Sequence, residues 1–314
     1  MVPTLYFVVP CYNEEEVLPL TGPVFAEKLK AFIDNGEVSE NSRVLFVNDG
    51  SRDKTWDLIL DLHSRYPLVT GIDLEENCGE KNALIAGMYH ASRFADCVIT
   101  MDCDLQDDVE VTGEMLEKYK TANDLVLGVR DRREDDPFSE RFCSAGFYLM
   151  MRLLRTGLVK QHSNFRLMSK RAIDALRPYE QIPYFLPAVA SNLPFPKTTV
   201  SHARAARRAG HSKYNYKSRL RLALDSALVH SPVLPAASWT GLFLCAAAAV
   251  AGLVLLLVFG LRDGVFSGWA FVLFTGGALG SLGFAVMSVW LTRLGLYKTY
   301  AQKKHIPGIK SKTD

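Results

Sequence analysis

The sequence predicts an α/β domain with a mostly parallel sheet, followed by two helices that span a membrane. Three observations support this prediction. Strand and helix patterns alternate through the first 130 residues, polar residues gather where the predicted strands end, and the C-terminal part of the chain holds two long stretches without charge. Alternation of this kind is typical of a sheet with helices on both faces.

Short apolar runs that are rich in branched side chains mark the predicted strands. Most of these runs are continuous rather than alternating, which is typical of parallel strands that are covered on both faces. The predicted strands are Leu5–Val9, Val44–Asn48, Val69–Leu74, Val98–Met101 and Asp124–Val129. The segments between them repeat apolar residues at helical spacing. The predicted helices are Val17–Ile33, Thr55–Ser64, Lys81–Arg93 and Val109–Lys120.

Two amphipathic segments follow the predicted sheet. Residues 131–139 form a charged loop, and the stretch Phe142–Leu154 beyond it has a broad apolar face. This stretch is expected to be a helix in the core or against the membrane surface. We favour the membrane surface, because the two spans hold the domain near the bilayer. A second amphipathic stretch, Tyr216–His230, leads into the first span and is expected at the interface.

The two uncharged stretches, Ala236–Phe259 and Val265–Leu291, are each long enough to cross a bilayer, which needs about 20 residues. A buried core helix is the alternative, but core helices of this length usually carry a polar stripe. Basic residues crowd both outer flanks, and between Arg204 and Arg221 every charged residue is Lys or Arg. The positive-inside tendency therefore predicts a multi-pass protein of the inner (plasma) membrane with both termini in the cytoplasm.

These features divide the chain into four parts. We expect a cytoplasmic α/β domain at 1–215, a juxtamembrane amphipathic helix at 216–235, two transmembrane helices at 236–292 and a basic cytoplasmic tail at 293–314. The N-terminus has neither a basic n-region nor an apolar h-region, so no cleaved signal is expected.

Charge and cysteine spacing argue against two classes of protein, those that bind nucleic acid and those held together by disulfides or zinc. The formal charge of +2 and the pI of about 8.1 give no argument for nucleic-acid binding, so no nucleic-acid partner is expected. The six cysteines form no C-x-x-C pair, and most lie in predicted strands or apolar segments. We therefore expect reduced thiols, with neither a disulfide framework nor a zinc site.

Four polar motifs follow predicted strands, at the edge where open α/β sheets bind ligands. They are Pro10–Glu15, Asn48–Asp53, Asn77–Asn82 and Asp102–Gln106. Singly each has a structural reading, since Asn13 suits a helix cap, Asn-Asp-Gly is a common turn, and Asp102 with Asp104 could be a cap and a loop acid. Together they indicate a ligand site. Hard carboxylate oxygens suit Mg²⁺ or Mn²⁺ shared with substrate phosphates, and Lys81 could meet such a phosphate.

The set resembles family 2 glycosyltransferases, which have the GT-A fold (a Rossmann-like, mostly parallel sheet). Within them it looks like the polyprenyl-phosphate glycosyltransferases, the group of dolichyl-phosphate mannose synthase and the GtrB-type enzymes. The resemblance covers nearly the whole chain. Its further elements are Gly128–Arg130, Asn164–Met168, Arg207–Tyr214, the two spans and a basic tail that ends near Lys304–Pro307.

The resemblance implies a role for each of the matching residues. The residues expected to bind the nucleotide-sugar donor are Pro10, Tyr12, Glu14, Asp49, Lys81, Asp102 and Arg130. The metal would lie among Asp102, Asp104 and Gln106, with Asp104 and Gln106 as direct ligands. The residues expected to bind the acceptor phosphate are Arg141, Arg166, Arg207 and Lys213, which fits the preference of phosphates for Arg and Lys. The basic residues from 204 to 221 could instead touch anionic lipid headgroups. The catalytic set would be Asp102, Asp104, Asn164 and Arg166.

Two residues depart from the family pattern. Asn164 stands where the family usually has an Asp assigned as the catalytic base, and Asn48 replaces the first Asp of the Asp-Asp-Gly-Ser form. An amide cannot accept a proton in that role. A phosphate monoester has its second pKa near 6, by analogy with phosphorylated side chains, so at neutral pH the lipid phosphate is largely anionic and needs no base.

We therefore expect a membrane-anchored, metal-dependent, inverting hexosyltransferase that moves one sugar from a nucleotide-sugar to polyprenyl (undecaprenyl) phosphate. UDP-glucose or UDP-N-acetylglucosamine is the expected donor, and mannose and aminoarabinose donors stay open. A processive polysaccharide synthase is disfavoured, because the Q-x-x-R-W motif is absent and two spans make a poor channel. A non-catalytic nucleotide-sugar sensor or scaffold is the other alternative, motivated by Asn164. Glycines on the second span permit a homo-oligomer.

Overall fold

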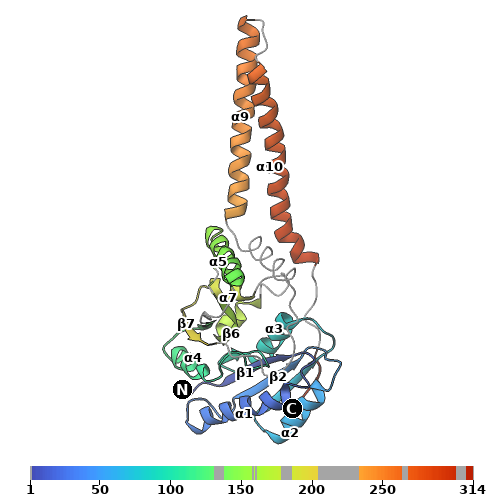
Figure 1. The fold of residues 1–314 in the computed structure, drawn as a ribbon, viewed down its shortest axis with the longest axis vertical. Coiled ribbons are helices and arrows are strands. Elements are labelled where there is room, and N and C mark those ends of the chain that lie inside the picture. The colour runs from blue at the N-terminus through green and yellow to red at the C-terminus, as the bar shows by residue number, and fades with distance from the viewer. Residues whose placement is uncertain are drawn as a thin grey trace.

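A computed structural model describes residues 2–130, 138–157, 159, 161–177, 186–203, 233–263, 268–301 and 309–313. These residues form an α/β domain from which two long helices extend side by side (Figure 1). The predicted fold class is confirmed. The loop at 131–137, the stretch Tyr216–His230 and the predicted ligands Arg207 and Lys213 lie outside the described residues.

The sheet has eight strands in the order β7-β5-β6-β4-β1-β2-β3-β8. Their bounds are β1 Leu5–Cys11, β2 Arg43–Asn48, β3 Val69–Leu74, β4 Cys97–Thr100, β5 Leu125–Arg130, β6 His162–Ser169, β7 Lys197–His202 and β8 Ile309–Lys312. The central strands β4, β1, β2 and β3 run parallel to one another, and β6 lies antiparallel between β4 and β5. All five predicted strands are present, so the carboxyl ends of β1, β2 and β4 meet at one edge.

Helices cover both faces of the sheet because side chains of each central strand alternate between two apolar cores. In β1, Phe7 and Val9 pack with α1 (Leu18–Asp34), α2 (Thr55–Arg65) and α4 (Val111–Lys120). Val8 points the other way and packs with α3 (Glu80–Ala91), α6 (Lys170–Asp174) and α7 (Leu186–Asn192). Both cores are fully buried, which is why the strands read as continuous apolar runs.

The two long helices are α9 (Val233–Asp263) and α10 (Gly268–Ala301), and each contains a segment long and apolar enough to cross a membrane. These segments are Ala236–Phe259 and Ala270–Val289, with mean hydropathies of 2.9 and 1.8, and few of their residues are buried. Helix α10 continues beyond the predicted end of the second span. An apolar pair of this kind, exposed on most sides, lacks the burial of a core helix.

Part of the predicted basic tail belongs to the sheet. Strand β8 pairs antiparallel with the edge strand β3. The Thr313 hydroxyl accepts a hydrogen bond from the Gly71 amide at 2.8 Å, and the Lys310 ammonium lies 3.5 Å from an Asp73 carboxylate oxygen. The C-terminus therefore returns to the α/β domain and covers an edge that would otherwise present unpaired backbone groups.

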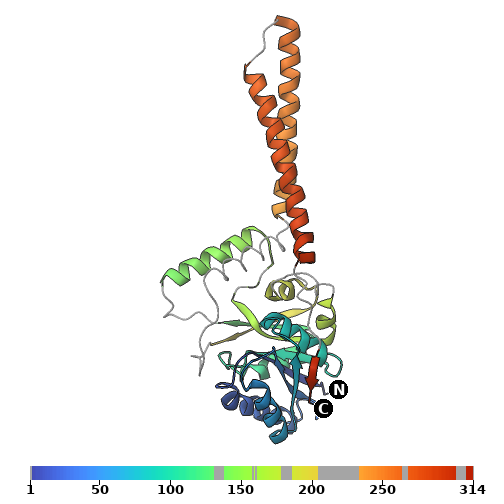
Figure 2. The same ribbon diagram turned by 90° about the vertical axis from the view of Figure 1, so that its right-hand side faces the viewer.

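Helix α5 (Phe138–Leu153) lies across the domain at the end from which the long helices extend (Figure 2). Of its described side chains, Met151 is buried, whereas Leu149 and Leu153 are 58% and 68% exposed. Apolar side chains of the predicted segment Phe142–Leu154 are therefore exposed on α5. That this segment is amphipathic and lies against a membrane stays a prediction.

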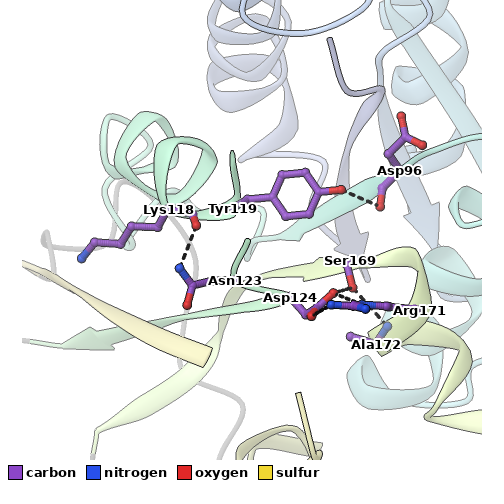
Figure 3. A network of polar contacts seen from close by, with 8 residues as sticks. All are labelled: Asp96, Lys118, Tyr119, Asn123, Asp124, Ser169, Arg171 and Ala172. Atoms are coloured by element: carbon purple, nitrogen blue, oxygen red, sulfur yellow. Dashed lines mark hydrogen bonds and ion pairs between the residues drawn. The ribbon is translucent and has the colours of Figure 1, made fainter. Parts of the chain in front are cut away.

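A polar network ties the sheet together at the edge opposite the predicted site (Figure 3). The buried Asp124 carboxylate pairs with the Arg171 guanidinium and accepts a hydrogen bond from the Ser169 hydroxyl at 2.7 Å. The same hydroxyl caps α6 by accepting from the Ala172 amide at 3.2 Å. A hollow of about 780 Å³ opens beside these residues, and none of the predicted site residues lines it.

Arg171→Met should lower the free energy of unfolding more than the loss of an exposed ion pair does, because it leaves the buried Asp124 carboxylate with weaker partners. The Arg171 hydrogen bonds lower the pKa of Asp124. A lowered carboxyl pKa in the folded state adds stability that is present above the ordinary pKa and lost as pH falls through the folded value. The difference in unfolding free energy between variant and wild type should thus shrink below about pH 4.

Denaturant titrations at pH 7 and pH 3 measure this difference. The control is Arg65→Met, which breaks an exposed ion pair within one helix and should cost under about 0.5 kcal/mol. An equal loss in both variants would contradict the prediction.

Candidate active site

The Asp-x-Asp motif continues β4 with alternating burial. Met101, Cys103 and Leu105 point into the apolar core, whereas Asp102, Asp104 and Gln106 are each half-buried on the other side. The backbone at Leu105 has φ of +49°, a conformation uncommon outside glycine, and the Gln106 amide donates to the Asp104 carboxylate at 3.2 Å. The three predicted metal ligands therefore share one side of the chain.

The loops after β1 and β2 interlock beside this segment. Because β1 and β2 are parallel and in register from Tyr6 to Cys11, their following loops meet. The Asn13 amide donates to the Ser51 hydroxyl at 3.0 Å, and the Glu14 amide donates to the Thr55 hydroxyl at 2.8 Å. A hollow of about 390 Å³ lies at this junction, lined by Asn13–Val17, Arg52 and Asp53. Pro10 near the end of β1 and Tyr12 in the following loop do not line this hollow.

The carboxylate of Asp49 is buried and accepts several hydrogen bonds. Its side chain accepts from the Asn77 amide at 3.1 Å, from the Cys78 backbone at 2.8 Å and from the Gly79 backbone at 3.0 Å. The carboxylate thus fixes the turn that precedes α3. A role for Asp49 in nucleotide binding stays a prediction.

Gly50→Ala should lower the free energy of unfolding by about 2 kcal/mol. A Cβ at Gly50 would lie 2.6 Å from the Asn77 backbone nitrogen, on a residue whose φ of +61° already disfavours a side chain. Gly36→Ala is the matched control, since its φ is +69° but nothing lies within 4 Å of a Cβ there. Denaturant titration of both variants measures the free energy of unfolding. Equal losses of stability in the two variants would contradict the prediction, because they would mean that the positive φ alone, without a clash at Asn77, accounts for the loss.

Asp102 lies in a strongly acidic environment. Burial raises the pKa of its carboxyl to about 8, and Glu80, Asp107 and Asp104 add to this rise, whereas Arg130 opposes it. Carboxylates gathered around another carboxyl favour a bound cation or proton. Within the described residues no three His, Cys, Asp or Glu side chains are close enough to hold a metal by themselves. A cation here would need other oxygen donors, such as substrate phosphates.

Asn164 lies level with Asp102 on the neighbouring strand, because the antiparallel register pairs Thr100 with Arg166. The Asn164 side-chain oxygen accepts from the Arg166 guanidinium at 3.1 Å, and its amide nitrogen donates to the Glu80 carboxylate. Arg166 has no exposed surface. The predicted phosphate ligand Arg166 is therefore a buried group that orients Asn164, and its contact with an acceptor stays a prediction.

Arg130 is also engaged. Its guanidinium donates to both oxygens of the buried Asp107 carboxylate, at 3.1 and 3.3 Å, and His202 lies 3.7 Å from the same carboxylate. Lys81 is the second residue of α3, next to Glu80, and burial lowers the pKa of its ammonium. The side chain of Arg141 in α5 is outside the described residues.

Sequence reasoning missed two acidic residues of this site, Glu80 and Asp107. Glu80 lies in a motif that the sequence singled out, and Asp107 follows the Asp-x-Asp segment directly. The only sequence signal for either was this proximity to a motif. The structure identifies them as part of the site, because Glu80 contacts Asn164 and Asp107 contacts Arg130.

Comparison with known proteins identifies the family of the chain. Residues 6–177 match the model of glycosyl transferase family 2. The chain is 39% identical over 253 residues to an uncharacterized glycosyltransferase, YkoT, of Bacillus subtilis, covering 80% of this chain and 75% of that one. It is 32% identical over 307 residues to the bactoprenol glucosyl transferase of Shigella phage SfV, covering 96% and 95%. A more distant solved structure is the glucosyl-3-phosphoglycerate synthase of Mycobacterium tuberculosis with Mn²⁺, UDP and glucosyl-3-phosphoglycerate, 14% identical at a TM-score of 0.44 over 72% and 78%. The matched domain, with its acidic residues at the strand ends, places the chain in glycosyl transferase family 2.

Proposed function

We propose that this protein transfers a single sugar from a nucleotide-sugar to a polyprenyl phosphate, with UDP-glucose as the first donor to test and UDP-N-acetylglucosamine as the second. The observation that carries the proposal is a family 2 domain joined to two apolar helices, in a chain matched along 96% of its length by a bactoprenol glucosyl transferase. The match includes both long helices as well as the catalytic domain, which favours an acceptor that resides in lipid.

The acidic residues after β4 fit a divalent cation. Asp102, Asp104 and Gln106 would hold Mg²⁺ or Mn²⁺, because they are oxygen donors on one side of the chain in surroundings that are strongly negative. Such a cation would neutralise the diphosphate leaving group. The loops after β1 and β2, with Glu14 beside the hollow, would bind the nucleotide.

The reaction we propose is one in-line displacement. A phosphate oxygen of the acceptor attacks the anomeric carbon, the bond from that carbon to the diphosphate breaks, and the electron pair leaves with the nucleoside diphosphate. One displacement inverts the configuration at the anomeric carbon. The protein contributes mainly by holding the two reactants in line, which is a large part of catalysis in transfers of this kind.

The helices α9 and α10 would anchor the domain in the membrane, and α5 would lie against the bilayer surface. Support comes from the exposed Leu149 and Leu153 on α5, at the end of the domain from which the long helices extend (Figure 2). A cytoplasmic location of the domain and of both termini, and self-association through α10, stay predictions.

Transfer of label tests the proposal. The full chain in membranes or detergent is given undecaprenyl phosphate and labelled UDP-glucose, UDP-N-acetylglucosamine, or a mannose or aminoarabinose donor, with Mg²⁺ or Mn²⁺. We expect label in an organic-extractable, acid-labile lipid with one of these donors. Binding of a nucleotide-sugar without turnover would favour the sensor, and growing polymer would favour the synthase.

A further inference from the structure

Several contacts hold Asn164 in one orientation. The charges of its two neighbours, Arg166 and Glu80, determine which way its side-chain amide faces. Its backbone carbonyl accepts from the Thr100 hydroxyl and from the Arg166 guanidinium, the latter at 3.3 Å. Its side-chain oxygen accepts from the same guanidinium at 3.1 Å. Since a guanidinium only donates, the amide nitrogen of Asn164 must face the other neighbour, the Glu80 carboxylate, which only accepts.

A carboxylate at both positions would be unfavourable. If residue 164 were Asp, as is usual in the resembling enzymes, two carboxylates would lie within hydrogen-bonding distance, and one would have to hold a proton. With Asn164, the pair contains one carboxylate, and it belongs to Glu80. The departure from the family pattern is therefore compensated by an acid that reaches the same place from another element.

Glu80 also faces the predicted reaction centre. Its carboxylate accepts a hydrogen bond from Asn164, which lies level with Asp102 on the neighbouring strand. As the first residue of α3 it would interact favourably with the helix dipole wherever its side chain pointed. The dipole does not explain why the side chain turns toward β6 and meets Asn164.

We propose that Glu80 is a catalytic residue of this enzyme, the carboxylate that accepts the proton of the attacking phosphate hydroxyl. This rests on the proposed function. The sequence led us to expect a largely ionised acceptor phosphate that needs no base, but several carboxylates near the bound acceptor would favour its monoanion. The monoanion carries one P–O–H group, and its proton must leave when the product forms. As its oxygen bonds to the anomeric carbon, the proton passes to Glu80 and the nucleoside diphosphate leaves. Asn164 and Arg166 are positioning residues that aim the carboxylate.

Three variants of the full chain test the proposal. Glu80→Gln keeps the shape of the side chain but removes the proton acceptor, so transfer should fall about 10²–10⁴-fold. Asn164→Asp combined with Glu80→Gln returns the carboxylate to position 164 and reverses the direction of the shared hydrogen bond. We expect this double variant to transfer at least tenfold faster than Glu80→Gln. Glu114→Gln, on the exposed face of α4, should behave as wild type.

Two further measurements show whether Glu80→Gln loses only the chemical step, rather than donor binding or the fold. Affinity for the nucleotide-sugar with Mn²⁺, and the midpoint of thermal unfolding, should be the same in Glu80→Gln and wild type. The proposal is overturned if Glu80→Gln transfers within threefold of wild type, if its donor affinity falls together with its activity, or if the double variant is no faster. If wild type itself transfers no sugar to polyprenyl phosphate yet binds the donor, the proposed function fails instead.

Discussion

Asp104→Ala should abolish sugar transfer, with a fall of about 10³-fold or more, because a cation that neutralises a leaving diphosphate is worth several kcal/mol. Asp104 is half-buried beside Gln106, on the same side of the chain as Asp102. Its removal would leave Asp102 as the one remaining carboxylate of the motif. The measurement is the initial rate of lipid-linked product as Mn²⁺ is varied, with donor affinity titrated in parallel.

The matched control is Asp108→Asn, four residues away. Asp108 is exposed and accepts from the Glu110 amide at 2.9 Å, a capping contact that an Asn side chain can keep. This variant should keep wild-type transfer and the same dependence on Mn²⁺. Full activity of Asp104→Ala in EDTA would reject the role of the metal, whereas wild-type activity that EDTA abolishes would support it.

The five predicted strands could be found from the sequence because each is an apolar run covered on both faces. Strand β6 was not predicted, since the polar Asn164 and the charged Arg166 alternate with Phe165 and Leu167, although Arg166 is fully buried. Strand β8 has two lysines in four residues and is a strand only because it pairs with β3, far away in the sequence. The pattern of residues within one segment gives no information about such long-range pairing.

The candidate site could be predicted to a similar extent. The strand-end position of Asp102 and Asp104 follows from the sequence, because a parallel strand delivers its following residues to the sheet edge. The partnership of Glu80 with Asn164 joins α3 to β6 across 84 positions, and only the register of β4 against β6 brings them together. The partners of Asp49 could not be predicted from its own segment either, since the turn to which it binds begins 28 residues later.

Gly277→Leu should separate the two long helices and lower the stability of the pair by about 3 kcal/mol, the upper range for overpacking. A Cβ at Gly277 would lie 2.7 Å from the Cys245 carbonyl oxygen and would press on the backbone of Ala249. Backbone atoms of a helix cannot move aside singly, so α10 as a whole would have to move away from α9. Gly252 makes a similar contact from the other helix, with a Cβ 2.8 Å from the Phe274 Cα.

Gly276→Leu is the matched control, because nothing lies within 4 Å of a Cβ at the adjacent position of the same helix. It adds the same side chain and the same hydrophobicity on the open side of α10, where lipid would accommodate it. The midpoint of thermal unfolding in detergent, followed through helical circular dichroism, should fall in Gly277→Leu and be unchanged in Gly276→Leu. Equal midpoints would mean that α9 and α10 do not pack at Gly277. A close approach of this kind is what small residues permit in a membrane, where packing rather than exclusion of water holds helices together.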